Sequence, residues 1–147
     1  PWSHAAVTRR ALDGDPEEAP LSTVSGTADR AVILGARTGS EAEWERAERD
    51  DVTVVSPEDV SDWTPDFDDE SMYLSVDIDG ADPSVAPGTG TMEPFGLAAR
   101  EMRDVVRAVA PNAVGFDAVE VNDRDDGQAA ALAGKLLKEF VFAHADG

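Results

Sequence analysis

Cysteine is absent from this chain of 147 residues, and histidine and lysine are rare. The histidines are His4 and His144, and lysine occurs only at positions 135 and 138. Without cysteine the chain can form no disulfide, no thiolate metal site and no cysteine nucleophile. The missing thiolates also speak against the binding of a soft metal ion.

Positive charge is scarce as well. The chain has 12 Lys and Arg residues against 31 Asp and Glu residues, for a formal net charge of -19 at pH 7. The acidic residues are scattered between apolar positions, which indicates a folded protein with an acidic surface rather than a disordered tail. So negative a field disfavours nucleic acid and anionic membranes as partners. It is best tolerated in concentrated salt, where screening is short-ranged, so we expect a salt-adapted (halophilic) source.

Long hydrophobic runs are missing too. No apolar segment approaches the length of a membrane span, and no signal peptide is visible. We therefore expect a cytoplasmic protein with no membrane partner. The length suits one domain that buries its own core, without an internal repeat or a low-complexity linker.

What the chain does contain is an alternation of short apolar runs with helical patterns, which predicts parallel β-α units. Strands are expected at residues 31–35, 52–55, 72–78 and 113–121, and residues 64–70 are predicted to be a loop. Helices are expected at residues 4–12, 40–49, 98–109 and 128–142. Ser40 is the candidate N-cap of the second helix.

Two of these helices carry an apolar stripe at helical spacing, and we expect both stripes to face the core. In the helix at 98–109 the stripe consists of Met102, Val105, Val106 and Val109. In the helix at 128–142 it consists of Ala129, Leu132, Ala133, Leu136, Leu137 and Phe140.

The most informative segment runs from Ser75 to Thr91 and reads SVDIDGADPSVAPGTGT. Asp77 and Asp79 stand two positions apart at the end of an apolar run, and side chains two apart along a strand point to the same face. Two carboxylates so close repel each other unless a cation lies between them, so we predict that both bind a divalent metal. The glycines and prolines that follow would fix an irregular loop beside that charge.

Two other interpretations of this segment compete with the metal site. The carboxylates could be helix or turn caps, which is the usual role of an isolated Asp-x-Asp. A calcium-binding EF-hand loop starting at Asp77 is excluded, because it requires an acidic or amide residue at 81, glycine at 82 and glutamate at 88. The chain has Ala81, Asp82 and Gly88 there.

The segment SVDIDGADPSVAPGTGT closely resembles a signature of the ureohydrolases, the family of arginases and agmatinases, which are manganese enzymes that release urea from guanidino compounds. The resemblance continues in GFDAVEVN at residues 115–122, in AVILGAR at residues 31–37 and in Ser3-His4. It implies an arginase-like α/β fold with three α/β/α layers and a mainly parallel sheet. It also implies a small cationic guanidino substrate and a homo-oligomer at full length.

The resemblance implies roles for four residues. Asp77 and Asp79 match ligands of the family's two Mn²⁺ ions, Glu120 matches the glutamate that binds the substrate guanidinium, and His4 resembles the histidine that passes a proton to the leaving amine. From the residues alone, Glu120 could be a strand-end ion pair and His4 a surface residue. Asp82 is predicted to brace the loop rather than to bind metal.

The chain lacks two motifs that the family carries earlier in the sequence, Gly-Gly-Asp-His and Asp-Ala-His-x-Asp, which supply the other metal ligands. We therefore expect residues 1–147 to be the C-terminal portion of a single ureohydrolase domain, with its N-terminal part missing. The chain by itself should then be inactive. The alternative is a non-catalytic remnant or a partner subunit.

The substrate suggested by this resemblance is agmatine, hydrolysed to putrescine and urea in polyamine biosynthesis. Arginine, guanidinobutyrate and formiminoglutamate stay open. The loop also departs from the family pattern at Met92, at Phe95 and at Asp123, and His4 is followed by Ala5 rather than glycine. These departures alter the rim of the predicted site rather than a metal ligand.

Overall fold

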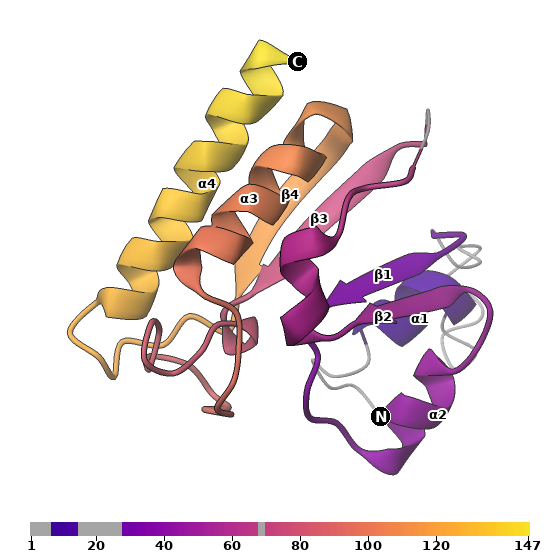
Figure 1. Cartoon of the computed structure of the whole chain (residues 1–147), viewed down its shortest axis with the longest axis horizontal. Helices are drawn as coiled ribbons and strands as arrows, with labels where there is room; N and C mark the ends of the chain where they lie inside the picture. The colour runs from indigo at the N-terminus through magenta and orange to yellow at the C-terminus, as the bar shows by residue number, and fades with distance from the viewer. Residues whose placement is uncertain (1–6, 15–27, 68–69) are drawn as a thin grey trace, which may run out of the picture.

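The computed structural model describes residues 7–14, 28–67 and 70–147. Within these residues the chain forms α/β units, and Figure 1 shows their arrangement. In chain order the main elements are α1 (Val7–Asp13), β1 (Ala31–Leu34), α2 (Glu41–Ala47), β2 (Val52–Val55), β3 (Met72–Asp77), α3 (Ala99–Val109), β4 (Ala113–Val119) and α4 (Gln128–Asp146). Short 3-10 helices lie at η2 (Pro57–Asp62), η3 (Ile78–Gly80) and η4 (Ala110–Asn112).

The described strands form two parallel pairs. β1 pairs with β2 from Ala31 beside Val52, and α2 provides the crossover between them. β3 pairs with β4, with a register irregularity between Met72 and Tyr73, and α3 provides that crossover. Parallel neighbours need such crossovers, because a tight hairpin cannot return the chain in the same direction. The predicted class of parallel β-α units is therefore confirmed.

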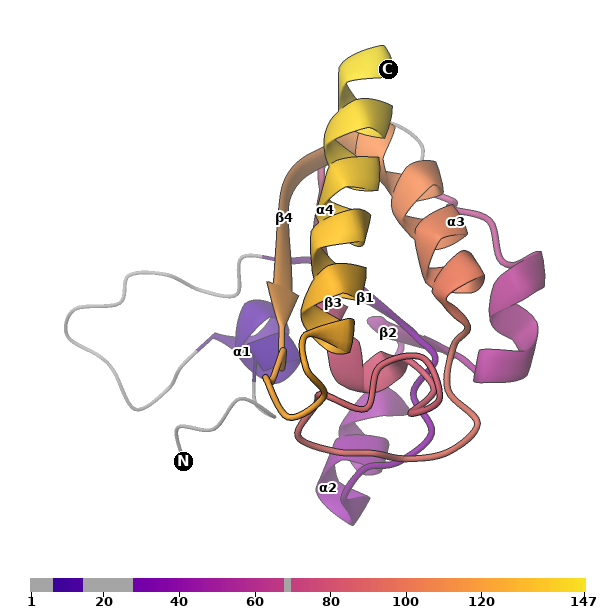
Figure 2. The same ribbon diagram turned by 90° about the vertical axis from the view of Figure 1, so that its left-hand side faces the viewer.

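The helices α3 and α4 pack side by side on the β3–β4 pair, as Figures 1 and 2 show from two directions. Their apolar stripes face the core, as the sequence pattern predicted, and supply a large part of it. The buried members are Met102, Val106, Val109, Ala129, Ala133, Leu136 and Phe140. One predicted member is wrong: Leu137 is 48% exposed, because it lies one position beyond Leu136 on the helix and so is turned away from α3 and the sheet.

A cluster of charged side chains around the buried Glu139 links α3 to α4. Glu139 is only 8% exposed and accepts hydrogen bonds from Arg107 on α3 at 2.7 Å and from Lys135 on its own helix at 2.6 Å. These two contacts lower the pKa of Glu139 below its ordinary value. The cluster satisfies a carboxylate that would otherwise be costly to bury.

The first strand pair is held by polar contacts. Ser40 caps α2 with a reciprocal bond, since the Glu43 amide donates to Ser40 Oγ and the Ser40 amide donates to the Glu43 carboxylate. This confirms the predicted cap. Arg46 donates to both oxygens of Asp51 at 2.7 Å and to Asp13 at 2.9 Å, joining α2 to β2 and α1. The hydrogen bond from Arg46 lowers the pKa of Asp51.

The predicted boundaries differ from the observed ones mainly at helix and strand ends. α4 extends to Asp146, beyond the expected end at 142, and η2 was not predicted. β3 ends at Asp77 and β4 at Val119, each earlier than expected, because the backbone turns where the predicted site begins. Within the described part of the chain, no helix has both the length and the apolar character that a membrane span needs.

Candidate active site

The predicted metal ligands lie where β3 ends. Asp77 is the last residue of the strand, whereas Asp79 lies in the 3-10 helix η3 that follows directly. The prediction that Asp77 and Asp79 lie two positions apart on one strand is therefore wrong, because the strand does not continue past Asp77. Both carboxylates still lie at the carboxyl end of a parallel strand, which is the edge at which open α/β sheets bind ligands.

Asp77 also acts as the N-cap of η3, which is the alternative that the sequence left open, since its Oδ1 accepts the Asp79 amide at 2.8 Å. Asp79 is not a cap: its Oδ1 accepts the Thr91 amide at 3.3 Å across the loop. A carboxylate has two oxygens and several lone pairs, so these bonds to Oδ1 are compatible with a metal on Oδ2.

Glu120 and Asp79 are brought together around Gly90. A methyl group added to Gly90 would lie 3.1 Å from Glu120 Oε2 and 3.9 Å from Asp79 Oδ2, so both oxygens border the same point of the backbone. Glu120 follows β4 with a left-handed φ of 59°. This conformation is unfavourable for a residue with a side chain and is typical of positions constrained by function.

The segment around Gly88 is fastened to the end of β4 from both sides. The Gly88 carbonyl accepts the Asn122 amide at 2.8 Å, and the Gly88 amide donates to Asp125 at 2.7 Å. A side chain at Gly88 would approach the Asn122 carbonyl and the Asp125 carboxylate to 2.4 Å, so glycine is required. Partial burial opposes ionisation of Asp125, but amides of Ala129, Gly88 and Gly127 outweigh it and lower its pKa.

Asp82 braces the loop, as predicted. Its Oδ1 accepts the Ser84 amide at 2.9 Å, and its Oδ2 accepts the amides of Phe95 at 2.9 Å and Gly96 at 3.3 Å. The hydrogen bond from the Ser84 hydroxyl is the main cause of its lowered pKa. These bonds hold the end of the loop against the segment that follows η3.

Two residues near the site were missed by the sequence analysis. Thr89 is 1% exposed, and its hydroxyl has no hydrogen-bond partner among the described residues. Such a group usually marks a place where a ligand, a water or another part of the protein belongs. Arg37, which follows β1, donates to carbonyl groups on both sides of the loop. Neither residue could be found from local patterns, since the partners of Arg37 are distant in sequence and the burial of Thr89 depends on tertiary packing.

Asp117 has a different role from the site residues. It accepts hydrogen bonds from the Tyr73 hydroxyl at 2.9 Å and from the Ser75 hydroxyl at 2.7 Å, both on the neighbouring strand β3. The bond to Asp117 raises the pKa of Tyr73. Asp117 therefore joins the two strands and does not belong with Asp77 and Asp79 as a predicted metal ligand.

The donor set fits manganese in chemistry and falls short of it in number. Carboxylate oxygens are hard ligands that suit Mn²⁺. Among the residues that the structure describes, however, no group of three His, Asp or Glu side chains is arranged to hold a metal ion. His4 lies outside the described residues, so its predicted place near the site is untested.

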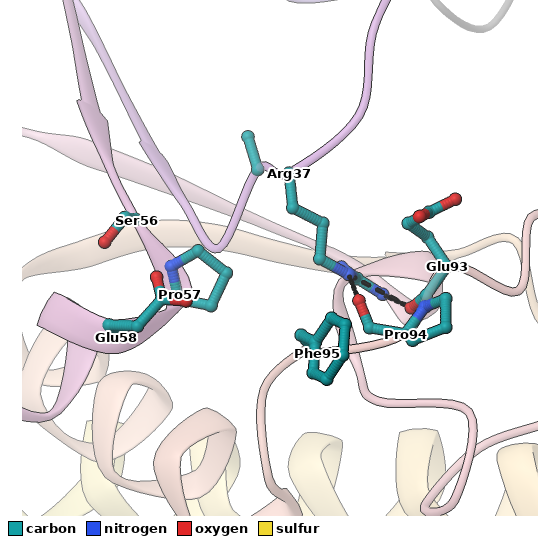
Figure 3. Close-up of a pocket in the computed structure, with 8 residues that line it drawn as sticks. Arg37, Ser56, Pro57, Glu58, Glu93, Pro94 and Phe95 are labelled. Carbon is teal, nitrogen blue, oxygen red and sulfur yellow. Dashed lines mark hydrogen bonds between the residues drawn. The ribbon is translucent and has the colours of Figure 1, made fainter.

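A cavity of about 360 Å³ lies beside residues 93–95, at the carboxyl ends of β1 and β2 (Figure 3). None of Asp77, Asp79 and Glu120 lines it. Its lining residues are Ala36, Arg37, Ser56, Pro57, Glu58, Glu93, Pro94 and Phe95.

Comparison with protein families identifies the likeness. The arginase family model matches residues 1–143. Agmatinase of Bacillus anthracis is 30% identical over an alignment of 146 residues, gaps included, that covers 90% of this chain and 50% of that protein. The mitochondrial arginase 1 of Arabidopsis thaliana is 29% identical over 150 residues, covering 95% of this chain and 41% of that protein.

Solved structures give the same result. The agmatine ureohydrolase of Thermoplasma volcanium superposes with a TM-score of 0.78 and 36% identity, over 97% of this chain and 47% of that one. Proclavaminate amidinohydrolase of Streptomyces clavuligerus has a TM-score of 0.63 and 30% identity, over 78% of this chain and 41% of that one. The chain thus spans about half the length of these relatives.

Proposed function

This chain belongs to the arginase family and has its α/β fold, and from that premise we propose that it is the C-terminal portion of a manganese-dependent ureohydrolase. The proposed reaction is hydrolysis of agmatine to putrescine and urea, within polyamine biosynthesis. Agmatine is chosen over arginine because the agmatine ureohydrolase is 36% identical and superposes over 97% of the chain. Arginase, guanidinobutyrase and formiminoglutamase activities are the alternatives.

The observation that carries this proposal is the meeting of Asp79 and Glu120 around Gly90. A guanidinium is planar and cationic, and a carboxylate can accept two parallel N–H donors from it. Glu120 would hold the substrate in this way beside the metal-binding carboxylates.

Asp77 and Asp79 would hold the manganese together with ligands from outside this chain, and the bound metal would supply a water whose pKa is lowered toward about 7. The overall reaction is addition of water to the guanidinium carbon and cleavage of the bond from this carbon to the substrate's alkyl nitrogen. The nitrogen leaves as a protonated amine, and we assign the transfer of that proton to His4, whose ordinary pKa suits the task.

The test is urea release by the native protein at its full length, after chelation and after return of Mn²⁺ or Mg²⁺. Urea from agmatine, restored by Mn²⁺ and not by Mg²⁺, is expected. Replacing Glu120 with Gln should lower kcat/KM by about 10- to 100-fold, the loss of a charged hydrogen bond. The matched control is Glu45→Gln, because Glu45 is exposed on α2 and belongs to no proposed contact. Turnover of arginine without agmatine would overturn the substrate assignment.

A second candidate is that the 147-residue chain itself is a non-catalytic remnant or partner subunit. It is favoured by the absence of a three-ligand group among the described residues. Two carboxylates alone should bind metal weakly. The chain by itself should therefore release no urea even with Mn²⁺ and concentrated salt, and measurable turnover would contradict this ligand set.

The charge of -19 supports a related proposal, that the protein works in concentrated salt and without nucleic-acid or anionic membrane partners. A homo-oligomer at full length is proposed from the resemblance to the family, and a cytoplasmic location is proposed as the default for this chain. Screening of self-repulsion should raise the unfolding midpoint as KCl increases. Thermal unfolding across a KCl series measures this, with sucrose as a control for exclusion effects that do not screen charge. An unchanged midpoint in KCl would contradict salt adaptation.

A further inference from the structure

Arg37 lies where two loops and the end of β1 meet. The chain leaves β1 through Gly35, which has a left-handed φ of 80° and contacts the Leu97 side chain so closely that a methyl group there would lie 2.9 Å from it. Only glycine meets both conditions without strain. This turn directs Arg37 toward the segment after β3 rather than along the β1–β2 pair.

The Arg37 guanidinium donates to carbonyl groups of two separate segments. On one side its Nη2 reaches the carbonyls of Asp79 and Ala81 at 3.1 Å, and its Nη1 reaches that of Gly80 at 3.3 Å. On the other side its Nε donates to the carbonyls of Glu93 at 3.1 Å and Pro94 at 3.0 Å, bonds that Figure 3 shows as dashed lines.

Both segments contact the candidate site directly. Residues 79–81 contain the metal ligand Asp79 and its next two neighbours, and Glu93 lies two residues after Thr91, whose amide donates to Asp79 Oδ1. The two segments also bond each other, since the Leu97 amide donates to the Gly80 carbonyl and the Asp82 amide to the Leu97 carbonyl, both at 2.9 Å. Arg37 therefore lies at the junction of the backbones that orient Asp79.

Arginine suits this junction for a physical reason. Carbonyls of five residues in two segments converge on this side chain, and those of residues 79–81 are partly buried, where an unpaired carbonyl is costly. A guanidinium offers five N–H donors in a rigid plane, whereas a lysine ammonium offers three on a flexible stem. Lysine could satisfy one segment but not hold both at a fixed separation.

We propose that Arg37 is a positioning residue for the metal-binding end of β3, acting through the carbonyls of residues 79–81 and 93–94. The guanidinium holds these two segments together, and so fixes the Asp79 carboxylate between its own backbone and the Thr91 amide. This inference rests on the proposed metal site. Partners that orient a metal ligand typically contribute roughly 10- to 100-fold to metal affinity.

The test uses the native protein at its full length and the variants Arg37→Met and Arg37→Lys. Mn²⁺ affinity is measured by calorimetric titration, and amide hydrogen exchange is measured in the metal-free protein. Arg37→Met should weaken Mn²⁺ binding by about 10- to 100-fold and speed exchange in residues 79–82 and 93–97, with α3 and α4 unchanged. Arg37→Lys should fall between Met and the native residue. Arg103→Met is the charge-matched control, because the ion pair of Arg103 among the described residues is with its neighbour Asp104 on α3.

The two measurements separate the possible failures. If the native protein binds no Mn²⁺, the proposed function fails, and the exchange comparison in metal-free protein still tests whether Arg37 orders the loops. Mn²⁺ affinity within twofold of the native protein in Arg37→Met, or unchanged exchange in both segments, would overturn the role of Arg37. If Arg37→Met also speeds exchange across α3 and α4, the substitution has unfolded the protein. The Arg37→Lys variant is then the deciding one. Native-like Mn²⁺ affinity and exchange in Arg37→Lys would overturn the proposed role of Arg37.

Discussion

The two strand pairs of this molecule are stabilised in different ways. The β3–β4 pair and its helices α3 and α4 contain most of the buried core among the described residues, and the rest lies in the 3-10 helices and in the loop after β3. In the β1–β2 pair no strand residue is fully buried, and α2 buries none of its side chains. The first pair depends instead on the Ser40 cap and on the contacts of Arg46 with Asp51 and Asp13.

This difference indicates which part of the chain is self-sufficient. Parallel strands are normally covered on both faces, and their burial supplies most of their stability. The β3–β4 pair has one covered face, whereas the β1–β2 pair is only half covered on the residues described. The chain spans about half the length of its relatives. Matched substitutions in the two strand pairs test this difference in stability.

The largest expected effect is from Leu136→Ala on α4. Leu136 is 1% exposed, so removing its side chain should leave a cavity and lower the free energy of unfolding by about 2–5 kcal/mol. Leu34→Ala on β1 removes the same atoms from a half-buried place and should cost less. Urea unfolding of the two variants measures both. Equal losses would show that the first strand pair is as well covered as the second.

A second, smaller effect is expected within the site. Gly88→Ala would place a methyl group 2.4 Å from the Asn122 carbonyl and the Asp125 carboxylate, and should cost about 1–3 kcal/mol by overpacking. Gly80→Ala is its control, because a methyl group there has nothing within 4 Å. Thermal unfolding of both variants tests this contrast, which would be lost if Gly88→Ala proved as stable as Gly80→Ala.

The smallest expected effect concerns the ion cluster on α4. The pKa of Glu139 is lowered on folding, so its contribution to stability is present above its ordinary value of 4.5 and is lost as the pH falls through its folded value. Glu139→Gln should therefore be less stable than the native chain at pH 7, and the difference should shrink below pH 4.5. Asp104→Asn, on an exposed pair, should change little. A difference that does not depend on pH would contradict this role for the Glu139 charge.

Much of the fold could be predicted from local pattern. The strands and the helices α3 and α4 followed from apolar pattern, whereas α2 followed from a polar run behind the Ser40 cap. Errors arose where tertiary contacts decide. The face of Leu137 depends on where α3 crosses α4, and the early end of β3 depends on the turn into η3.

The residues of the candidate site likewise include some that the sequence predicts and some that it does not. Asp77, Asp79 and Glu120 carry chemistry that is readable from residue type and from resemblance to the ureohydrolases. The brace at Asp82 was also predictable, because aspartate beside a Pro-Ser turn usually bonds the backbone that follows. Arg37 and Thr89 were not, since an arginine that binds distant carbonyls looks in sequence like any surface arginine.

The sequence by itself determined the parallel β-α class, the acidic surface, the family and the carboxylates on which the proposed chemistry depends, because these follow from residue type, spacing and motif. Only the tertiary structure decided that Asp79 and Glu120 border the same glycine, that Glu120 adopts a left-handed backbone, and that Arg37 joins the two loops beside them. The physical reason is that these contacts join residues some 30–60 positions apart, where no local periodicity records which backbone will lie beside which.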